Sequence, residues 1–421
     1  MDKVTLKPQM LKGTVCVPPS KSAVHRLLLA SFLSGRKCKI KNVELSKDIS
    51  AMLDGLSCLG AEYTYGKRSK TVTLKRTKAP CENAEIDCIE SATVLRFLMP
   101  ISLLFSKSSV LKGEGRLLSR PLLPYKRALE ENGACIKRTG NAIEVSGSLK
   151  SGRYEICGNV SSQFISGLLF ALPLLDGDSE IIVTSETEST GYIDMTLSVL
   201  KKFGIEIENR NYLSYFIKGG QSYKAIDTEA EGDWSQAAFF LGLDSLGCDI
   251  RCTGLDINSV QGDRAILDII KSIGAKVIVD TDGIAVKRTA VMNGITVDAK
   301  DIPDLVPILA VILSFCDGES QIINAGRLRM KESDRLSGIC DELRHLGADI
   351  RMCGDGISVK GVQVLSGNTV SARDDHRIAM ALSVAASRCE SETVDIIGGA
   401  EAVKKSYPDF FEIYKSLETQ N

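Results

Sequence analysis

Aromatic residues, histidines and paired-cysteine motifs are scarce in this sequence. Aromatic residues make up 5% of the 421 residues, which leaves few stacking platforms for single-stranded nucleic acid. The 52 basic and 53 acidic residues give a formal net charge of −1, which argues against bulk nucleic-acid binding. The three histidines, His25, His345 and His376, show no metal-ligand spacing. We therefore expect neither a structural nor a catalytic metal.

The cysteine pattern and the absence of long apolar segments indicate the compartment. Thirteen cysteines are scattered without a CxxC motif, and Cys248 and Cys252 are the closest two. That usage is typical of reduced, mostly buried thiols in the cytosol. Residues Met1 to Thr5 lack signal or transit character, and the longest apolar stretch, around Leu305 to Cys316, is too short to span a bilayer. We expect a soluble cytoplasmic protein that does not bind membranes.

A helix-start pattern recurs along the whole chain at a constant interval. At each occurrence a serine or an aspartate precedes an apolar run, and each lies 71 residues after the one before. The six positions are Ser20, Ser91, Ser162, Asp233, Asp304 and Asp375. Serine and aspartate are favourable N-caps, and helices that are apolar all round are buried. The pattern predicts six buried helices with capped starts.

Glycines that would end amphipathic helices recur in step with the caps. They are Gly60, Gly133, Gly204, Gly274 and Gly347, at intervals of 73, 71, 70 and 73 residues. Each repeat then contains a strand, a buried helix, a strand, an amphipathic helix and two strands, so the predicted fold class is α/β. A period near 70 residues is too long for the common solenoids, so we expect six βαβαββ units folded into compact bodies.

Three repeats for each domain give two similar domains. The first spans residues 20–228, and the second joins residues 1–19 to 229–421. The sixth repeat lacks its closing strands, and we expect the N-terminal strands between Val4 and Val17 to complete it. The backbone then crosses twice between the domains, which favours a hinge and a cleft.

The helix starts carry side chains that suit anions. Aligned N-termini of buried helices place positive dipole ends together, and cations beside serine caps are suited to phosphate or carboxylate. The residues concerned are Lys21, Ser22, Arg26, Arg96, Arg120, Ser161, Ser162, Gln163, Lys331, Arg335, Arg377 and Lys405. Any one of these cations alone would ordinarily be a solvated surface charge. Their recurrence at equivalent positions favours a site for two anionic substrates.

A few carboxylates accompany this cationic set. They are Asp48, Asp233, Asp304, Glu332, Asp334 and Asp375. Three of them also fit the simpler role of helix caps. Paired Asp and Glu among cations suit general acid and base chemistry. Lys331 and Arg335 are four residues apart, so we expect one helical face to present both to a ligand.

Six ordered motifs resemble those of the 5-enolpyruvylshikimate-3-phosphate synthase family. They are Pro19-Ser20-Lys21-Ser22 with Arg26, Ser161-Ser162-Gln163-Phe164, Ile302-Pro303-Asp304, Lys331-Glu332-Ser333-Asp334-Arg335, Asp375-His376-Arg377 and Lys405-Ser406-Tyr407-Pro408-Asp409. The resemblance implies transfer of the enolpyruvyl group of phosphoenolpyruvate to the 5-hydroxyl of shikimate 3-phosphate, by addition and elimination, with release of phosphate. It implies two domains of three βαβαββ units, no cofactor and no metal, and we expect a monomer.

The resemblance also implies residue roles. Asp304 would take the proton of the attacking hydroxyl, Glu332 would donate to the methylene carbon, and Lys21 would assist catalysis. How Asp304 and Glu332 share the proton transfers stays open. Shikimate 3-phosphate would be held by Lys21, Ser22, Arg26, Ser161, Ser162, Gln163, Ser189, Asp304 and Lys331. Phosphoenolpyruvate would be held by Lys21, Ala92, Arg96, Arg120, Gln163, Arg335, His376, Arg377 and Lys405.

Four positions depart from the family pattern. Glu90 and Arg327 stand where the family often has Asn, and Phe97 stands where it often has Pro. Ala92 replaces a Gly that lets the backbone approach phosphoenolpyruvate closely. Because the herbicide glyphosate occupies that place in the family and is longer, the added methyl predicts a glyphosate-tolerant enzyme. The alternative is that Glu90 and Phe97 reshape the loop and restore the space.

Three other functions were weighed. The sister enolpyruvyl transferase acting on UDP-N-acetylglucosamine carries a reactive Cys on a loop of the second repeat, and the corresponding residues 113–120 contain none. A non-catalytic binder of anionic metabolites would be expected to have lost Lys21, Asp304 or Glu332, and all three are present. An RNA-end enzyme built on related units is disfavoured by the balanced charge.

Overall fold

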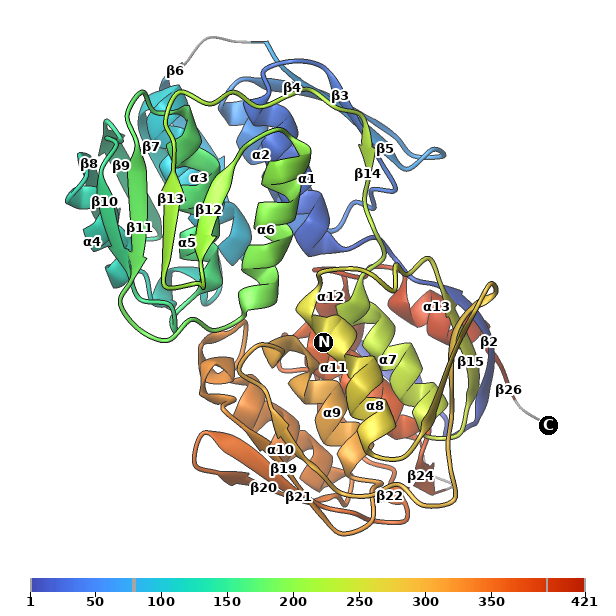
Figure 1. Cartoon of the computed structure of the whole chain (residues 1–421). Helices are drawn as coiled ribbons and strands as arrows, with labels where there is room; N and C mark the ends of the chain where they lie inside the picture. Colours follow the sequence, from blue (N-terminus) through green and yellow to red (C-terminus); the bar gives the residue numbers. More distant parts are fainter. Residues whose placement is uncertain (1, 78–80, 391–392, 420–421) are drawn as a thin grey trace. The chain divides into compact units, whose positions relative to one another are not determined.

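The chain folds as two compact domains (Figure 1). A computed structural model describes residues 2–77, 81–390 and 393–419. The continuous domain is Pro19–Glu231, and the discontinuous domain joins Met1–Pro18 to Gly232–Asn421. Each contains its own cluster of buried apolar side chains. Among the described helices, none is long and apolar enough to cross a membrane.

The continuous domain contains three successive copies of one α/β unit. Its described α-helices are α1 (Lys21–Leu33), α2 (Lys47–Cys58), α3 (Ala92–Phe105), α4 (Leu123–Glu130), α5 (Ser162–Ala171) and α6 (Thr190–Lys202). Its described strands are β3 (Cys38–Lys41), β4 (Ala61–Gly66), β5 (Thr71–Arg76), β6 (Cys81–Asp87), β7 (Ser106–Lys112), β8 (Ala134–Thr139), β9 (Ala142–Gly147), β10 (Arg153–Ile156), β11 (Ser179–Val183), β12 (Ile207–Arg210), β13 (Ser214–Ile217) and β14 (Thr228–Glu229). The α/β class predicted from the sequence is confirmed.

The three sheets of the continuous domain share one topology. Their strand orders are β14-β3-β5-β4, β6-β7-β9-β8 and β10-β11-β13-β12. In each sheet the first two strands are parallel, and the remaining neighbours are antiparallel. A helix crosses over between the parallel strands in two of these sheets, α3 between β6 and β7 and α5 between β10 and β11. The recurring sequence pattern therefore corresponds to a recurring βαβαββ sheet.

The discontinuous domain repeats the same unit. Its described α-helices are α7 (Trp234–Ser245), α8 (Ile266–Ser272), α9 (Val306–Leu313), α10 (Arg335–His345), α11 (His376–Ala386), α12 (Gly399–Val403) and α13 (Phe410–Ser416). Its main strands are β1 (Lys3–Leu6), β2 (Leu11–Cys16), β15 (Asp249–Thr253), β16 (Lys276–Asp280), β17 (Gly283–Lys287), β18 (Thr296–Asp298), β19 (Glu319–Ile323), β20 (Asp349–Cys353), β21 (Gly356–Lys360), β23 (Thr369–Ser371) and β25 (Val394–Ile397), with the short strands β22 (Leu365–Ser366), β24 (Cys389–Glu390) and β26 (Glu418–Thr419). The sheet β18-β19-β21-β20 has the order seen three times in the continuous domain.

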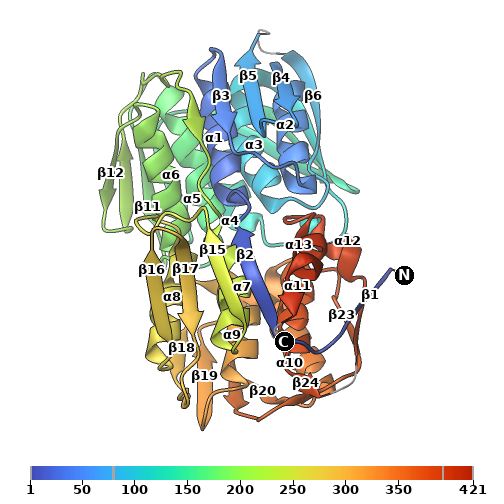
Figure 2. The ribbon, with the colours of Figure 1, turned by 90° about the vertical axis from the view of Figure 1, so that its right-hand side faces the viewer.

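The two N-terminal strands join different repeats. We expected both to complete the sixth repeat, but only β1 lies there, antiparallel to β25. Strand β2 instead pairs in parallel with β15 of the fourth repeat (Figure 2). The opening strand of the first repeat is β14, which pairs with β3 and precedes α7. The chain thus exchanges opening strands between the first and fourth repeats.

The inner helices follow from the apolar sequence pattern. In α9 all eight residues are buried, and α7 is buried along its entire length. Helices apolar on every side have no solvent face, so they lie inside a domain. The glycines that end the amphipathic helices have φ of 103°, 98°, 80°, 100° and 87° at Gly60, Gly133, Gly204, Gly274 and Gly347. Such positive φ values favour glycine, and the predicted helix stops are confirmed.

Four of the six predicted N-caps are confirmed. Ser20, Ser91, Asp233 and Asp375 each accept a backbone N–H of their helix. In the third repeat the cap is Ser161 rather than Ser162, because Ser161 has the extended backbone and Ser162 is already helical. The prediction that Asp304 is a cap was wrong, and its side chain forms ion pairs instead.

Candidate active site

Arg96 joins the starts of two inner helices in the continuous domain. It lies in α3, and its Nη1 donates to Ser161 Oγ at 3.0 Å and to Gln163 Oε1 at 2.8 Å. Gln163 donates from Nε2 to Thr93 Oγ1 at 2.8 Å. The guanidinium carbon lies 5.0 Å from the centroid of the Phe164 ring, within cation–π range. Three residues predicted separately are therefore one bonded cluster.

A glycine lets α5 approach α3 closely enough for these contacts. A Cβ on Gly167 would lie 2.7 Å from the carbonyl oxygen of Arg96, closer than real contacts allow. Tyr125 donates from its hydroxyl to the same carbonyl oxygen at 3.0 Å. The backbone of Arg96 is thus held by α4 and α5, and its side chain is directed by the cap of α5.

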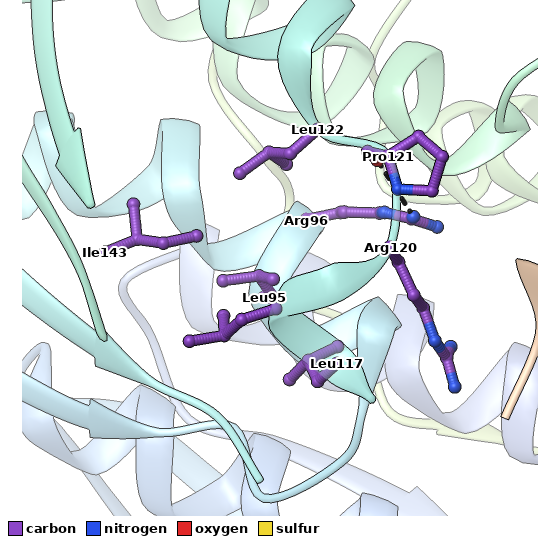
Figure 3. Close-up of a pocket in the computed structure, with 8 residues that line it drawn as sticks. Leu95, Arg96, Leu117, Arg120, Pro121, Leu122 and Ile143 are labelled. Carbon is purple, nitrogen blue, oxygen red and sulfur yellow. Dashed lines mark hydrogen bonds between the residues drawn. The ribbon is translucent and has the colours of Figure 1, made fainter. Parts of the chain in front are cut away.

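A small pocket opens beside Arg96 and the loop after β7 (Figure 3). Arg96 Nη2 donates to the carbonyl oxygen of Pro121 at 3.4 Å. Arg120 precedes Pro121, and Figure 3 shows its side chain pointing away from the apolar side of the pocket. The other lining residues are Leu95, Leu117, Leu118, Leu122 and Ile143. The pocket lining thus combines the Arg96 guanidinium with apolar side chains.

The first turns of α1 hold an ion pair and a buried histidine. Lys21 Nζ lies 2.8 Å from Asp48 Oδ2, and the two side chains are 19% and 7% exposed. His25 is fully buried, and burial is the main cause that lowers its pKa to about 3. The imidazole is therefore neutral at physiological pH. Lys21 remains partly accessible, as a substrate contact requires.

Arg26 is enclosed by protein acceptors. Its Nε donates to Thr196 Oγ1, its Nη1 to the Ser22 carbonyl and its Nη2 to the Tyr192 carbonyl, each at 2.8 Å. Burial lowers the pKa of Arg26 to about 10, so it remains charged. Through these bonds Arg26 connects α1 to α6. Sequence reasoning missed Tyr192, whose only signal is its place in the first turn of a helix.

The other predicted residues of this domain lie at helix starts. Ser22 and Ser162 are in the first turns of α1 and α5. Ala92 is the first residue of α3 and is 8% exposed. Ser189 precedes α6 with φ of 58°, an uncommon left-handed conformation for a residue other than glycine. The predicted serines thus lie in or directly before the first turns of α1, α5 and α6.

Arg335 is the centre of the charged cluster in the discontinuous domain. Its side chain is 1% exposed and donates to three carboxylates. The distances are 2.7 Å from Nε to Asp375 Oδ2, 2.9 Å from Nη1 to Asp304 Oδ1 and 2.8 Å from Nη2 to Glu332 Oε2. Ser333 Oγ also donates to Asp375 Oδ2, at 3.1 Å. A single guanidinium therefore fixes both carboxyls expected to carry out acid and base steps.

Asp304 forms ion pairs with three cations. Besides Arg335, Lys331 Nζ lies 3.4 Å from Oδ1, and Arg377 Nη2 lies 3.1 Å from Oδ2. Arg377 Nη1 also donates to the Asp304 carbonyl at 3.2 Å. Asp304 lies within the short helix η4 (Pro303–Leu305) rather than before α9. The N-cap position of α9 is Leu305, which leaves the Asp304 carboxylate to the three cations.

Burial and ion pairing act on the cations in opposite directions. Burial alone would lower the pKa of Arg335, but Asp375, Glu332 and Asp304 outweigh it and raise that pKa above the usual value. For Lys331, burial is the largest cause and lowers the pKa, against the opposing effect of Asp304. Of these two cations, Lys331 is therefore the one that gives up a proton more readily.

Lys331 and Arg335 do not share a helical face as we expected. Lys331 has extended backbone at the end of η5 (Gly326–Met330), and Arg335 begins α10. Asp334 caps α10 by accepting from Ser337 N at 3.1 Å. Lys331 and Arg335 nevertheless reach the same oxygen of Asp304, because the chain turns between them.

Two further predicted residues are also buried in this domain. His376 follows the cap of α11 and is 1% exposed. Lys405 lies after α12 and is 6% exposed. Their burial distinguishes them from solvated surface cations.

Sequence reasoning missed Asp263. This residue lies in η3 (Gly262–Ala265) and is 3% exposed. Ser235 Oγ donates to its Oδ2. Burial, and next the charge of Asp304, raise the pKa of Asp263 to about 7. No motif marked it, because its position depends on which helices η3 packs against.

Cations at the starts of buried helices, with carboxyls held among them, define an enzyme that acts on anionic substrates by acid–base chemistry. The family model of EPSP synthase (3-phosphoshikimate 1-carboxyvinyltransferase) matches residues 6–414. The chain belongs to this family. Proteins named 3-phosphoshikimate 1-carboxyvinyltransferase are similar to it: that of Clostridium perfringens is 44% identical over 419 residues, and that of Clostridium novyi is 45% identical over 427 residues. Each alignment covers 99% of this chain and 98% of the relative.

Solved structures agree with this family. EPSP synthase from Acinetobacter baumannii is 25% identical, with a TM-score of 0.82 over 100% of both chains. The enolpyruvyl transferase NikO from Streptomyces tendae is 16% identical, with a TM-score of 0.80 over 99% of this chain and 98% of that one. The second likeness concerns the fold alone.

Proposed function

We infer that this protein transfers the enolpyruvyl group of phosphoenolpyruvate to the 5-hydroxyl of shikimate 3-phosphate and releases phosphate. Family membership over nearly the whole chain supports this reaction. The proposed mechanism rests on the hydrogen bonds from Arg335 to both Asp304 and Glu332. Through two nitrogens of its rigid guanidinium group, Arg335 holds the proton acceptor, Asp304, and the proton donor, Glu332.

The reaction is balanced with these two carboxyls. In the addition, Asp304 takes the proton of the 5-hydroxyl as its oxygen bonds to the enol carbon, and Glu332 gives a proton to the methylene carbon. In the elimination, the methyl group returns a proton to Glu332, the carbon–oxygen bond to phosphate breaks, and the leaving phosphate takes the proton from Asp304. The same scheme with the two roles exchanged also balances. Bound anionic substrate favours protonation of Glu332, because its charge offsets that of Arg335.

The residues proposed to contact shikimate 3-phosphate are serines, cations, an amide and a carboxylate. The continuous domain contains Lys21, Ser22, Arg26, Ser161, Ser162, Gln163 and Ser189, and the discontinuous domain contains Asp304 and Lys331. Buried serines at helix starts offer neutral donors together with the helix dipole. Arg26 would contribute by holding the backbone of Ser22, since its own nitrogens bond to protein acceptors.

Four of the nine proposed contacts to phosphoenolpyruvate are arginines. The continuous domain contains Lys21, Ala92, Arg96, Arg120 and Gln163, and the discontinuous domain contains Arg335, His376, Arg377 and Lys405. The contacts of Arg96 with Ser161 and Gln163 support this assignment, because they hold a guanidinium group at the start of α5. A phosphate and a carboxylate each suit bidentate guanidinium recognition.

We propose that the enzyme tolerates glyphosate. Ala92 is buried at the first turn of α3, four residues before Arg96. A methyl group in a close-packed site costs about 1–3 kcal/mol when a ligand has to crowd it. Glyphosate is longer than phosphoenolpyruvate, so the methyl group would reduce its binding free energy more.

We also propose a cytoplasmic monomer. The thirteen cysteines are all free thiols. Free thiols in this number suit a reducing compartment. Size-exclusion chromatography with light scattering tests the monomer.

The reaction is tested by phosphate release. Purified protein is mixed with phosphoenolpyruvate and either shikimate 3-phosphate or UDP-N-acetylglucosamine. We expect phosphate and the enolpyruvyl product only with shikimate 3-phosphate. Turnover of the UDP sugar would support the sister transferase, and binding without turnover of either would support a non-catalytic binder.

A further inference from the structure

Gln236 is a buried amide to which the mechanism above gives no task. It lies in the first turn of α7 and is 2% exposed. Its Nε2 donates to Ser406 Oγ at 3.2 Å. Its Oε1 is buried, and among the described residues it has no hydrogen-bond partner. A serine hydroxyl both donates and accepts, so turning the amide over would only move the missing bond from Oε1 to Nε2.

The unpartnered end of this amide lowers the stability of the fold. A buried polar atom without a partner is less favourable than an apolar group of the same size. Ser406 is half-buried, so its hydroxyl can bond to water if the glutamine is replaced. An unbranched apolar side chain such as methionine would therefore fill this place without leaving a buried polar atom unpaired. Stability alone does not explain a glutamine here, and Ser406 directly follows Lys405 in the chain.

The segment that carries Lys405 is held against α7 at two points. Lys405 follows α12, a helix of only five residues, and so short a helix depends on its packing to stay in place. The first point is the bond from Gln236 to Ser406. At the second, the ring of Phe240 meets that of Tyr407 edge-on, with 6.3 Å between their centroids. Gln236 and Phe240 are four residues apart on one face of α7, so they hold two successive residues of the segment.

We propose that Gln236 is a positioning residue for Lys405: its bond to Ser406 fixes the backbone beside Lys405 and so holds the ammonium group ready for phosphoenolpyruvate. Without that bond, the ammonium group would be ordered only when the substrate binds, and affinity would fall by the entropy lost then. The unpartnered Oε1 is the loss of stability that accompanies the bond. The proposal rests on the proposed role of Lys405 in binding phosphoenolpyruvate.

Three variants test this role through the KM for phosphoenolpyruvate. Gln236→Met removes the bond to Ser406 together with the unpartnered oxygen. We expect KM to rise about two- to tenfold, the factor that corresponds to one hydrogen bond, with kcat changed less than KM. Ser406→Ala removes the same bond from its other side and should give the same rise. Lys405→Met should raise KM at least as far, and adding Gln236→Met to it should raise KM no further, because both changes act through one contact.

Gln261 provides a matched control for stability. It is 6% exposed and contacts the same end of α7, but both ends of its amide are bonded. Its Oε1 accepts from Trp234 N at 3.1 Å, and its Nε2 donates to the Gly232 carbonyl at 2.8 Å. Gln261→Met should lower the midpoint of urea unfolding, because it leaves these two backbone groups unpaired. Gln236→Met should leave the midpoint unchanged or raise it.

Several results would overturn the proposal. They are an unchanged KM in Gln236→Met or in Ser406→Ala, a further rise in KM when Gln236→Met is added to Lys405→Met, and a urea midpoint of Gln236→Met as low as that of Gln261→Met. Ser406→Ala leaves α7 intact, so it tests the bond even if Gln236→Met does not fold. An unchanged KM in Lys405→Met would overturn the role of Lys405 and this proposal with it. Failure of the proposed function would appear separately, as a wild-type enzyme without turnover.

Discussion

Replacing Arg335 by Lys keeps a positive charge but leaves one nitrogen where three now bond. Arg335 donates separately to Asp375, Asp304 and Glu332, and its side chain is 1% exposed. A lysine reaches one of these carboxylates well, so two charge-assisted bonds are lost. Each such bond contributes about 1.5–3 kcal/mol, so the expected loss in free energy of unfolding is about 3–6 kcal/mol. Natural proteins have about 5–15 kcal/mol in total, so the variant should fold but be marginal.

The assay is urea unfolding followed by circular dichroism, beside steady-state kinetics. Arg329→Lys is the matched control, because Arg329 is a 40% exposed arginine of the same segment that pairs with Asp334 at 3.4 Å. An exposed pair contributes about 0–1 kcal/mol, so this control should unfold nearly as wild type does. A loss below about 1 kcal/mol for Arg335→Lys would refute the reasoning, since the three bonds would then contribute no more than a surface pair.

Four further outcomes are expected. Asp304→Ala and Glu332→Gln should each lower kcat about 10²–10⁴-fold in steady-state assays, while equilibrium binding of shikimate 3-phosphate changes less; near-normal kcat would show that the residue is not catalytic. Arg120→Ala should raise the KM for phosphoenolpyruvate and leave the affinity for shikimate 3-phosphate unchanged. Equal losses for both ligands would contradict the assignment of Arg120 to phosphoenolpyruvate. Ala92→Gly should bind glyphosate about 10- to 100-fold more tightly, as 1.4 kcal/mol corresponds to tenfold, and an unchanged inhibition constant would exclude Ala92 as the cause of tolerance. Burial raises the folded-state pKa of Asp244 to about 7, so its contribution to stability is present below about pH 4 and lost as pH rises to 7. Asp244→Asn should flatten that part of the pH dependence in urea unfolding, and an unchanged slope would contradict it.

Local chemistry explains which features the sequence predicted well. A serine or aspartate that accepts its own helix's N–H, and a glycine that takes positive φ, act within a few residues of themselves. Ser20 and Gly60 are examples, and both have the predicted conformations. The third cap was displaced by one residue because two serines are adjacent, and both have the required hydroxyl. In the structure Ser161 is the cap, and its Oγ also accepts a hydrogen bond from Arg96.

Non-local pairing explains what the sequence did not show. Periodicity counts strands but does not name their partners, so the exchange of β2 and β14 between repeats was not predicted. The role of Asp304 likewise depends on Arg335 and Arg377, which are 31 and 73 residues away. No local sequence pattern connects its carboxylate to these cations.

The sequence by itself determined six repeats, their class and the residue types at their helix starts, because caps, glycine stops and apolar periodicity are properties of short segments. Only the tertiary structure decided which charged residues lie close enough to shift one another's pKa. Asp263 is the clearest case: nothing next to it in the chain makes it unusual, and its pKa of about 7 arises from burial and from Asp304, which is contributed by another element. Electrostatic interaction depends on distance through space and on the exclusion of water, and a linear sequence specifies neither.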